Sequence, residues 1–378
     1  TCMSMIRKSQ KLINVCYDIR GPVLEEAKRL EDEGSRIIKL NIGNPAPFGF
    51  EAPDEITQDV VRNISKSSGY TESFGLFEPR KSIMHYTQQK NISDVEVDDI
   101  VLGNGVSELI VMAMQGLINN EDEVLIPKPD YPLWTASVTL AGGNAVHYFC
   151  DEASDWAPDL DDIKSKITNK TKAILIINPN NPCGNVATAD EVDRLLSIAS
   201  KWPNCMVVAD EIYDGLDFTG HQVSVASRSH NVPVFSLNGV SKVYYAPGWR
   251  IGYMAIHDPQ GRMNLVRDGI ERMLRSRLCA STPAQLGYLA GLVSDRTWMD
   301  AYKQKVIAQR DLCIERIAAI DGLEVQAPGG AFYMFVKLTD EKWAQDDKNF
   351  ALDLLHKEHV LVVHGSGFSA QLGKGHFR

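Results

Sequence analysis

The chain alternates continuous apolar runs with polar, turn-forming stretches between about residues 98 and 242. Stretches with helical spacing of apolar residues, such as SELIVMAMQGLI and ADEVDRLLSIAS, lie between these runs. Unbroken apolar runs are typical of strands buried on both faces, and their alternation with helices is typical of a parallel sheet. We therefore predict an α/β protein whose parallel sheet is covered by helices on both faces. The runs, with the residues that follow them, are DIVLGNG, DEVLIPKPDY, KAILIINPNNPCG, MVVADEIYD and VPVFSLNGVSK.

The two ends of the chain carry patterns of a different kind. Residues 22–34, PVLEEAKRLEDEG, begin with proline, place apolar residues on one face and end at glycine, which predicts a short amphipathic helix. Residues 298–321 predict a long amphipathic helix, and AFYMFVKL at 331–338, after a Pro-Gly-Gly turn, predicts an alternating strand. These elements indicate a second, smaller α+β region.

Charge and composition narrow the classes of partner. The 378 residues carry 39 Lys and Arg against 49 Asp and Glu, a net charge of −10, which disfavours nucleic acid and anionic membranes. No apolar run could span a bilayer and the N-terminus lacks a signal-peptide core, so we predict a cytoplasmic protein. Seven cysteines without CxxC spacing favour reduced thiols, and His356 with His359 lacks a third ligand, so no metal site is predicted. The cysteines are Cys2, Cys16, Cys150, Cys183, Cys205, Cys279 and Cys313.

Reactive and polar residues follow the ends of the predicted strands. Ligands of open parallel sheets bind beyond the carboxyl ends of the strands, so these residues are expected to gather at one edge. Taken singly, Gly105-Val106-Ser107 could be a helix cap, Asp210 a solvated carboxylate and Lys242 a surface lysine. Their shared position favours a binding site. The set comprises Asn104 to Ser107, Asp130 with Tyr131, Asn178 to Gly184, Asp210 to Tyr213, and Asn238 to Lys242.

This set meets the chemical demands of pyridoxal phosphate. A lysine forms a Schiff base with the aldehyde, a carboxylate keeps the pyridine nitrogen protonated, donors restrain the ring hydroxyl, and a flat side chain covers the ring. The phosphate requires backbone amides at a helix N-terminus and a bidentate arginine. The residues predicted for these roles, in the same order, are Lys242, Asp210, Asn181 with Tyr213, Tyr131, the turn Gly105-Val106-Ser107, and Arg250.

Five segments, in this order, resemble the class I and II aminotransferases of pyridoxal-phosphate fold type I. They are GNGVSELI, PDYPLW, NPNNPCG, ADEIYD and NGVSKVYYAPGWRIGY. The resemblance runs from KLNIGNPAPFGFEAPDE to GHFR, and the NIGNPAPFGFEAPDE segment is very similar to that of bacterial glutamate–pyruvate (alanine) aminotransferases. It implies a mainly parallel, seven-stranded sheet flanked by helices in a large domain, residues 45–292. It also implies a small α+β domain from both chain ends, residues 1–44 (with an N-terminal arm) and 293–378.

The resemblance implies roles for single residues as well. Lys242 would hold the cofactor and move the proton between the substrate Cα and the cofactor, with Asp210 and Tyr213 as further catalytic residues. Ser241 would join the phosphate site, and Tyr70 would reach the phosphate of the neighbouring subunit, which implies a homodimer. The residues implied to bind the amino acid substrate are Gly43, Asn181 and Arg378.

The sequence departs from this family's pattern at three places. Gly239 stands where many relatives have Ser or Thr, so one hydroxyl contact to the phosphate is missing or replaced. Cys183 stands where NPxNPTG relatives have Thr, and we expect it to be a small neutral residue rather than a reactive thiol. The chain ends at Arg378 where relatives continue through a strand and a helix, which leaves open a truncated or disordered tail.

The implied reaction is transamination between an L-amino acid and a 2-oxo acid, with L-alanine and 2-oxoglutarate giving pyruvate and L-glutamate. An aspartate, aromatic or broad-specificity aminotransferase of the same fold is the alternative. A nicotinamide dehydrogenase is disfavoured because Glu108 stands where GxGxxG needs its third glycine. A transcription regulator with this module would need a basic helix-turn-helix domain, and only about twenty residues precede the first helix. β-Elimination or ring closure stays open, because the cofactor-holding residues are shared across reactions.

Overall fold

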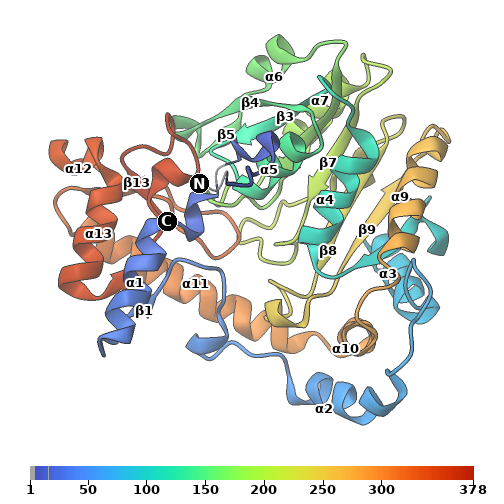
Figure 1. Ribbon diagram of the computed structural model, residues 1–378, viewed down its shortest axis with the longest axis horizontal. Coiled ribbons are helices and arrows are strands. Elements are labelled where there is room, and N and C mark those ends of the chain that lie inside the picture. Colours follow the sequence, from blue (N-terminus) through green and yellow to red (C-terminus); the bar gives the residue numbers. More distant parts are fainter. Residues whose placement is uncertain (1–4, 16) are drawn as a thin grey trace.

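The computed structural model describes residues 5–15 and 17–378, and a mixed sheet forms its centre (Figure 1). Within these ranges the sheet has eight strands in the order β2-β9-β8-β7-β6-β3-β4-β5. The five strands from β8 to β4 in this order are mutually parallel, while β9 runs antiparallel to its neighbours β2 and β8. The strands are β2 (Ile100–Gly103), β3 (Glu123–Lys128), β4 (Asn144–Asp151), β5 (Ala157–Pro158), β6 (Thr171–Ile177), β7 (Met206–Asp210), β8 (Val234–Gly239) and β9 (Gly252–His257).

Helices cover both faces of this sheet. Every residue of β2, β7, β8 and β9 is buried, and because successive side chains point to opposite faces, neither face can be open to solvent. The mainly parallel sheet is therefore confirmed, with the two-residue edge strand β5 added to seven longer ones. The helices of this part of the chain are α2 (Asp54–Asn63), which packs on α10, and α3 (Phe77–Gln89), α4 (Val106–Leu117), α5 (Pro132–Leu140), α6 (Leu160–Lys166), α7 (Ala189–Ala199), α8 (Val225–Arg228), α9 (Asn264–Ser276) and α10 (Thr282–Val293).

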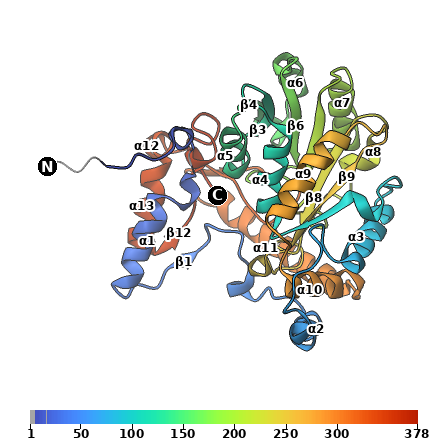
Figure 2. The ribbon, with the colours of Figure 1, turned by 45° about the vertical axis from the view of Figure 1, so that its right-hand side comes forward.

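A smaller region combines segments from both ends of the chain. A separate apolar cluster joins Val23, Ala27 and Ile37 to Ala351 and Leu355, so the first and last parts of the chain pack together (Figures 1 and 2). Strand β1 pairs with β12 in parallel, and β10, β11 and β13 form an antiparallel sheet. The domain limits themselves stay a prediction. The elements are α1 (Pro22–Asp32), β1 (Ile38–Lys39), α11 (Thr297–Ala318), β10 (Leu323–Val325), β11 (Val336–Leu338), α12 (Glu341–Gln345), α13 (Asp347–Glu358), β12 (Val360–Leu361) and β13 (His376–Phe377).

Two expectations for these end segments need correction. The helix α11 forms, but of its residues only Val306 is buried, so its apolar face is weaker than predicted. The strand expected at 331–338 forms only over β11. Its first half is a turn, because Ala331 has a φ of 59° and its amide donates to the carbonyl of Leu216 at 2.8 Å instead of joining a ladder. This turn releases Tyr333 from the sheet.

Two further findings concern the length of the helices and the state of the cysteines in the described ranges. No helix there is both long and apolar enough to cross a membrane. Five cysteines are free thiols, as predicted, while Cys2 and Cys16 lie outside the described residues. The five are Cys150, Cys183, Cys205, Cys279 and Cys313.

A buried ionic cluster fixes the loop that follows β7. Lys90, just after α3, lies 3.1 Å from the carboxylate of Glu211 and 2.7 Å from that of Asp214. Tyr86 donates a hydrogen bond to Asp214 at 2.7 Å, and Ser224 donates to Glu211 at 3.0 Å. Burial disfavours the charged form of Lys90, but the two carboxylates outweigh it and hold its pKa well above the usual range.

We predict that Lys90→Met lowers the free energy of unfolding by about 3 to 5 kcal/mol, because it leaves the buried carboxylate of Glu211 and the partly buried one of Asp214 without their cation. Urea unfolding of both proteins measures the difference. Lys28→Met makes the same substitution on the exposed face of α1 and should change stability by less than about 0.5 kcal/mol. A loss as small as that of the control would contradict the structural role of the cluster.

Candidate active site

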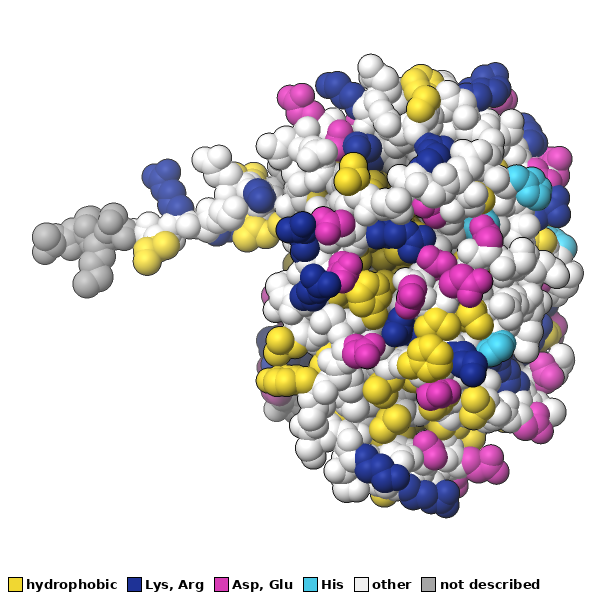
Figure 3. All heavy atoms as spheres, turned by 90° about the vertical axis from the view of Figure 1, so that its right-hand side faces the viewer, with side chains coloured by type: hydrophobic (Ala, Val, Ile, Leu, Met, Phe, Trp, Pro, Cys, Tyr) yellow, Lys and Arg dark blue, Asp and Glu magenta, His cyan; other side chains and the backbone are white. Residues whose placement is uncertain are grey.

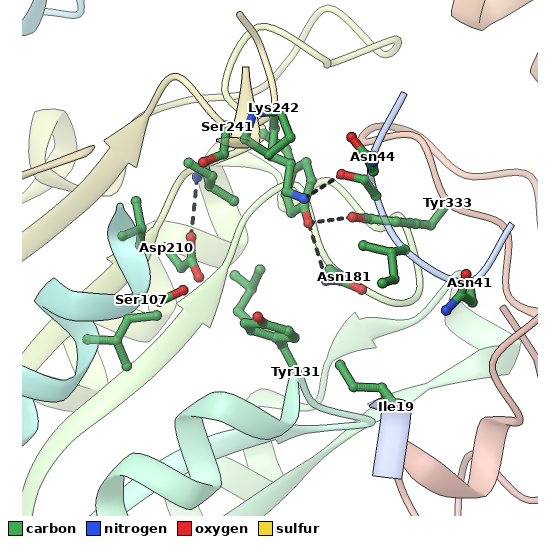
Figure 4. A pocket seen from close by; sticks show the side chains of 18 of the residues that line it. Ile19, Asn41, Asn44, Ser107, Tyr131, Asn181, Asp210, Ser241, Lys242 and Tyr333 are labelled. Atoms are coloured by element: carbon green, nitrogen blue, oxygen red, sulfur yellow. Dashed lines mark hydrogen bonds between the residues drawn. The ribbon is translucent and has the colours of Figure 1, made fainter. Parts of the chain in front are cut away.

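A cavity of about 590 Å³ opens beyond the carboxyl ends of the parallel strands. Segments from both chain ends form its other wall, and Figure 4 shows Lys242, Tyr333 and Asn181 converging in its middle. The structure thus brings together most of the residues predicted from the sequence. Those lining the cavity are Gly43, Val106, Ser107, Tyr131, Asn181, Asp210, Tyr213, Ser241, Lys242, Arg250 and Arg378.

Lys242 reaches this cavity because it follows the buried strand β8 by three residues. Its Nζ donates a hydrogen bond to the carbonyl oxygen of Gly43 at 2.8 Å and lies 5.8 Å from the centre of the Phe332 ring. The next residues towards the N-terminus, Ser241 and Val240, are buried. The lysine side chain is therefore anchored at its base and ends inside the cavity, where it is available for covalent chemistry.

Asp210 is a buried carboxyl group at the end of β7. It is 4% exposed and accepts hydrogen bonds from Trp134 Nε1 at 3.1 Å and from the amide of Ile212 at 3.3 Å. Burial raises the pKa of Asp210 to about 6, although both hydrogen bonds oppose that shift. The carboxylate form of Asp210 can accept a hydrogen bond from a ring nitrogen placed in the cavity and keep that nitrogen protonated.

A chain of side-chain hydrogen bonds crosses the cavity floor. Arg378 Nη1 donates to Asn181 Oδ1 at 2.7 Å, and Asn181 Nδ2 donates to the Tyr213 hydroxyl at 3.2 Å. Tyr213 donates in turn to the hydroxyl of Tyr333 at 3.0 Å. Burial raises the pKa of Tyr213 well above its usual value. Burial opposes ionisation of Tyr333 too, but the charges of Lys242 and Arg378 outweigh it and lower its pKa.

Arg378 and Asn41, which both line the cavity, each keep one side-chain nitrogen without a partner among the described residues. The side chain of Arg378 is buried, Nη2 donates to the carbonyl oxygen of Asn41 at 2.7 Å, and the guanidinium lies 4.3 Å from the centre of the Tyr333 ring. Its Nε and the side-chain amide nitrogen of Asn41 are buried and have no hydrogen-bond partner in the described chain. Unsatisfied buried donors are costly, so an anionic acceptor would stabilise this corner.

A second anion-binding corner lies at the N-terminus of α4. Gly105 precedes this helix with a φ of 81°, and a Cβ there would overlap the guanidinium of Arg250. Arg250 donates to the carbonyl oxygens of Pro247 at 2.9 Å and Asn104 at 3.3 Å. The amides of the first turn of α4, with Ser107 and this guanidinium, fit a phosphate group.

Tyr131 directly precedes α5 and presents a flat ring to the cavity (Figure 4). Its hydroxyl accepts a hydrogen bond from Tyr17 at 3.0 Å, and burial raises its pKa. This bond brings the segment before α1 over the site. Sequence reasoning missed Tyr17 and its neighbour Arg20, which also lines the cavity, because neither follows a strand.

Three other sequence expectations concern single positions. A Cβ at Gly239 would lie 2.7 Å from the carbonyl oxygen of Ile251, so the Ser or Thr of relatives would not fit here without a shift of the backbone. Cys183 is buried and its pKa is well above the usual range, as expected of a neutral residue. Tyr70, in contrast, is 82% exposed and does not line the cavity of its own chain.

Comparisons with known proteins agree with this geometry. The glutamate-pyruvate aminotransferase of Escherichia coli is 48% identical over 97% of this chain and 91% of its own length. The alanine aminotransferase of Mycobacterium bovis is 43% identical over 96% and 85%. A crystal structure of an Escherichia coli aminotransferase superposes with a TM-score of 0.95 at 47% identity, covering 99% of this chain and 93% of that one.

The family model of the aminotransferases of class I and II matches residues 35–378. Enzymes of this family depend on pyridoxal phosphate and exchange amino groups between amino acids and 2-oxo acids. The matched range contains Lys242, Asp210 and the two corners of the cavity that contain Arg250 and Arg378. The chain therefore belongs to the class I and II aminotransferases.

Proposed function

We propose that this enzyme transfers the amino group of L-alanine to 2-oxoglutarate, giving pyruvate and L-glutamate, with pyridoxal phosphate as its cofactor. The observation that carries the proposal is the single cavity that joins Lys242 and Asp210 to two anion-binding corners. The amino acid specificity is supported by relatives named glutamate-pyruvate and alanine aminotransferases at 43% to 48% identity. Aspartate and aromatic donors remain the alternatives that the experiment below tests.

The residues of the cavity fit the cofactor group by group. When bound, pyridoxal phosphate supplies an aldehyde for imine formation and a ring that accepts electrons. We propose that Lys242 binds the aldehyde carbon, that Asp210 keeps the ring nitrogen protonated, and that Tyr131 covers the ring. The ring oxygen is assigned to Asn181 and Tyr213, and the phosphate to Ser241, Arg250 and the turn Gly105-Val106-Ser107.

The substrate α-carboxylate is assigned to Arg378. A planar guanidinium can hold both carboxylate oxygens, and the unpartnered donors Arg378 Nε and Asn41 Nδ2 point to an anion at this corner. Gly43 lines the same cavity, and a residue with a Cβ at this position would overlap the Tyr333 hydroxyl. This arrangement directs the substrate Cα towards Lys242, which would take and return its proton.

Glutamate brings a second carboxylate, and Arg20 is positioned to receive it. Arg20 lines the cavity, is exposed, and has no ion pair with any residue whose side chain the structure describes. Its backbone directly precedes α1, which is anchored in the apolar cluster of the smaller region. Of the four cations that line the described cavity, the other three already have assigned roles.

We predict that the enzyme uses alanine in preference to aspartate and aromatic donors when 2-oxoglutarate is the acceptor. Arg20→Gln should raise KM for glutamate and 2-oxoglutarate roughly ten- to a hundredfold, because a charged hydrogen bond to the distal carboxylate is lost. KM for alanine and pyruvate should change little. Steady-state kinetics with a panel of donors and both acceptors measures these values.

Arg36→Gln serves as the matched control, because Arg36 is an exposed arginine of the same region that does not line the cavity. It should leave all four KM values unchanged. Faster turnover of aspartate or of aromatic amino acids than of alanine would contradict the proposed specificity. Equal changes in KM for mono- and dicarboxylic substrates in Arg20→Gln would contradict the role of Arg20 but not the proposed preference for alanine.

We also propose a homodimer in which Tyr70 of one subunit completes the phosphate site of the other. Tyr70 is exposed in the single chain, and the N-terminal segment carrying the exposed Met5 and Ile6 extends away from the body (Figures 2 and 3). Exposed apolar side chains of this kind are typical of surfaces that another chain covers.

Mixing Lys242→Ala with Tyr70→Phe subunits tests the shared site. We predict that heterodimers regain activity above that of either parent, because one of their two sites combines an intact Lys242 with an intact Tyr70 from the partner. Activity assays on re-associated mixtures measure this, with each variant mixed with itself as the control. A fully active monomer in sedimentation analysis would rule out the proposal.

A further inference from the structure

Tyr333 is a cavity residue for which neither the sequence motifs nor the assignments above provide a role. It is 9% exposed, and its hydroxyl accepts the hydrogen bond from Tyr213. Figure 4 shows it entering the cavity from the side opposite Asp210. The question is what a second buried phenol does beside the reactive lysine.

The hydroxyl of Tyr333 and the carbonyl of Gly43 enclose the amine of Lys242. The carbonyl oxygen of Gly43 accepts from Nζ at 2.8 Å. A Cβ on Gly43 would lie 2.9 Å from Nζ and would overlap the Tyr333 hydroxyl, so both polar groups meet at this one point of the backbone. The charge of Lys242 lies close enough to the Tyr333 hydroxyl to lower its pKa. The amine therefore lies beside two oxygen atoms on the same side of the cavity, and it donates to the Gly43 carbonyl.

Tyr333 is held firmly enough to act as a fixed acceptor. Its ring packs edge-on against the ring of Tyr213, with 5.5 Å between centres, and lies against the guanidinium of Arg378. The turn that carries it is tied to the loop after β7 by the hydrogen bond from Ala331 to Leu216. These contacts on two sides of the ring fix the position of the Tyr333 oxygen.

The donors and the lone pair of a neutral amine explain why this geometry matters for Lys242. A neutral lysine amine has two N–H donors and one lone pair. If Gly43 and Tyr333 accept from the two N–H groups, the lone pair is left as the only free position, and it faces the cavity. Lys242 would have a free amine of this kind whenever the substrate's nitrogen takes its place on the cofactor.

We propose that Tyr333 is a positioning residue that, together with the Gly43 carbonyl, aims the lone pair of Lys242 at the substrate Cα. The inference rests on the proposed function. In the step concerned, the Cα–H bond would break and an N–H bond would form on Nζ, while the C–H electron pair would stay with the substrate, for which the bound cofactor would supply the electron sink. The resulting ammonium returns its proton, so nothing is consumed and no further reactant is needed.

Tyr333→Phe removes the acceptor and keeps the ring. We expect the exchange of the alanine α-hydrogen in D₂O, followed by proton NMR at saturating alanine, to slow roughly ten- to a hundredfold in the holoenzyme. The alanine concentration for half-maximal exchange and the dissociation constant of pyridoxal phosphate, measured by equilibrium dialysis, should change by less than about threefold. A merely structural role would weaken these two constants as well.

Tyr302→Phe is the matched control. The Tyr302 hydroxyl donates to the backbone carbonyl of Glu51 at 3.1 Å outside the cavity, and its loss should leave the exchange rate unchanged. An exchange rate in Tyr333→Phe equal to that of the wild type overturns the proposal, and so does a loss caused only by weaker alanine or cofactor binding. Because exchange needs no oxo acid, a wild type that exchanges the α-hydrogen but does not form glutamate would contradict the proposed function and not this inference.

Discussion

One continuous chain of hydrogen bonds joins three parts of the molecule that are far apart in sequence. It runs from Arg378 through Asn181 and Tyr213 to Tyr333, and beside its end Lys242 donates a separate hydrogen bond to the carbonyl of Gly43. The segments around Gly43, Tyr333 and Arg378 belong to the wall of the cavity, whereas the other residues stand on the edge of the main sheet. Hydrogen bonds in a buried network are mutually dependent. The position of Lys242 therefore depends on how the segments around Gly43 and Arg378 pack against the cavity.

The electrostatics of the site differ from those of the whole protein. The chain carries a net charge of −10, yet among the described residues that line the cavity there are four cations and one carboxyl group. Burial holds the pKa of that group, Asp210, at about 6, so it adds less negative charge than an exposed carboxylate would. A cavity of this kind concentrates small anions against the overall charge, which suits substrates that are carboxylic acids and a cofactor that carries a phosphate.

The parts of the site that stand at strand ends could be predicted from the sequence. Lys242, Asp210 and Asn181 follow unbroken apolar runs, and the carboxyl ends of parallel strands meet at one edge. Tyr333 was missed because the alternation of AFYMFVKL resembles a strand, whereas the positive φ of Ala331 turns this segment into the cavity. Arg20 and Tyr17 were missed because their place depends on how α1 packs against α13, which local patterns do not report. Strand β9 is not predicted either, since its short apolar run directly follows the polar segment that carries Lys242 and Arg250.

The central claim is that Lys242 is the residue that binds the cofactor covalently. Reduction of the holoenzyme with borohydride fixes the cofactor to its lysine, and peptide mapping by mass spectrometry identifies that lysine. The structure predicts a single labelled peptide containing Lys242, since its amine ends inside the cavity between the buried carboxyl group and the two anion-binding corners. A label on any other lysine, or no label on a protein that binds pyridoxal phosphate, would contradict the account.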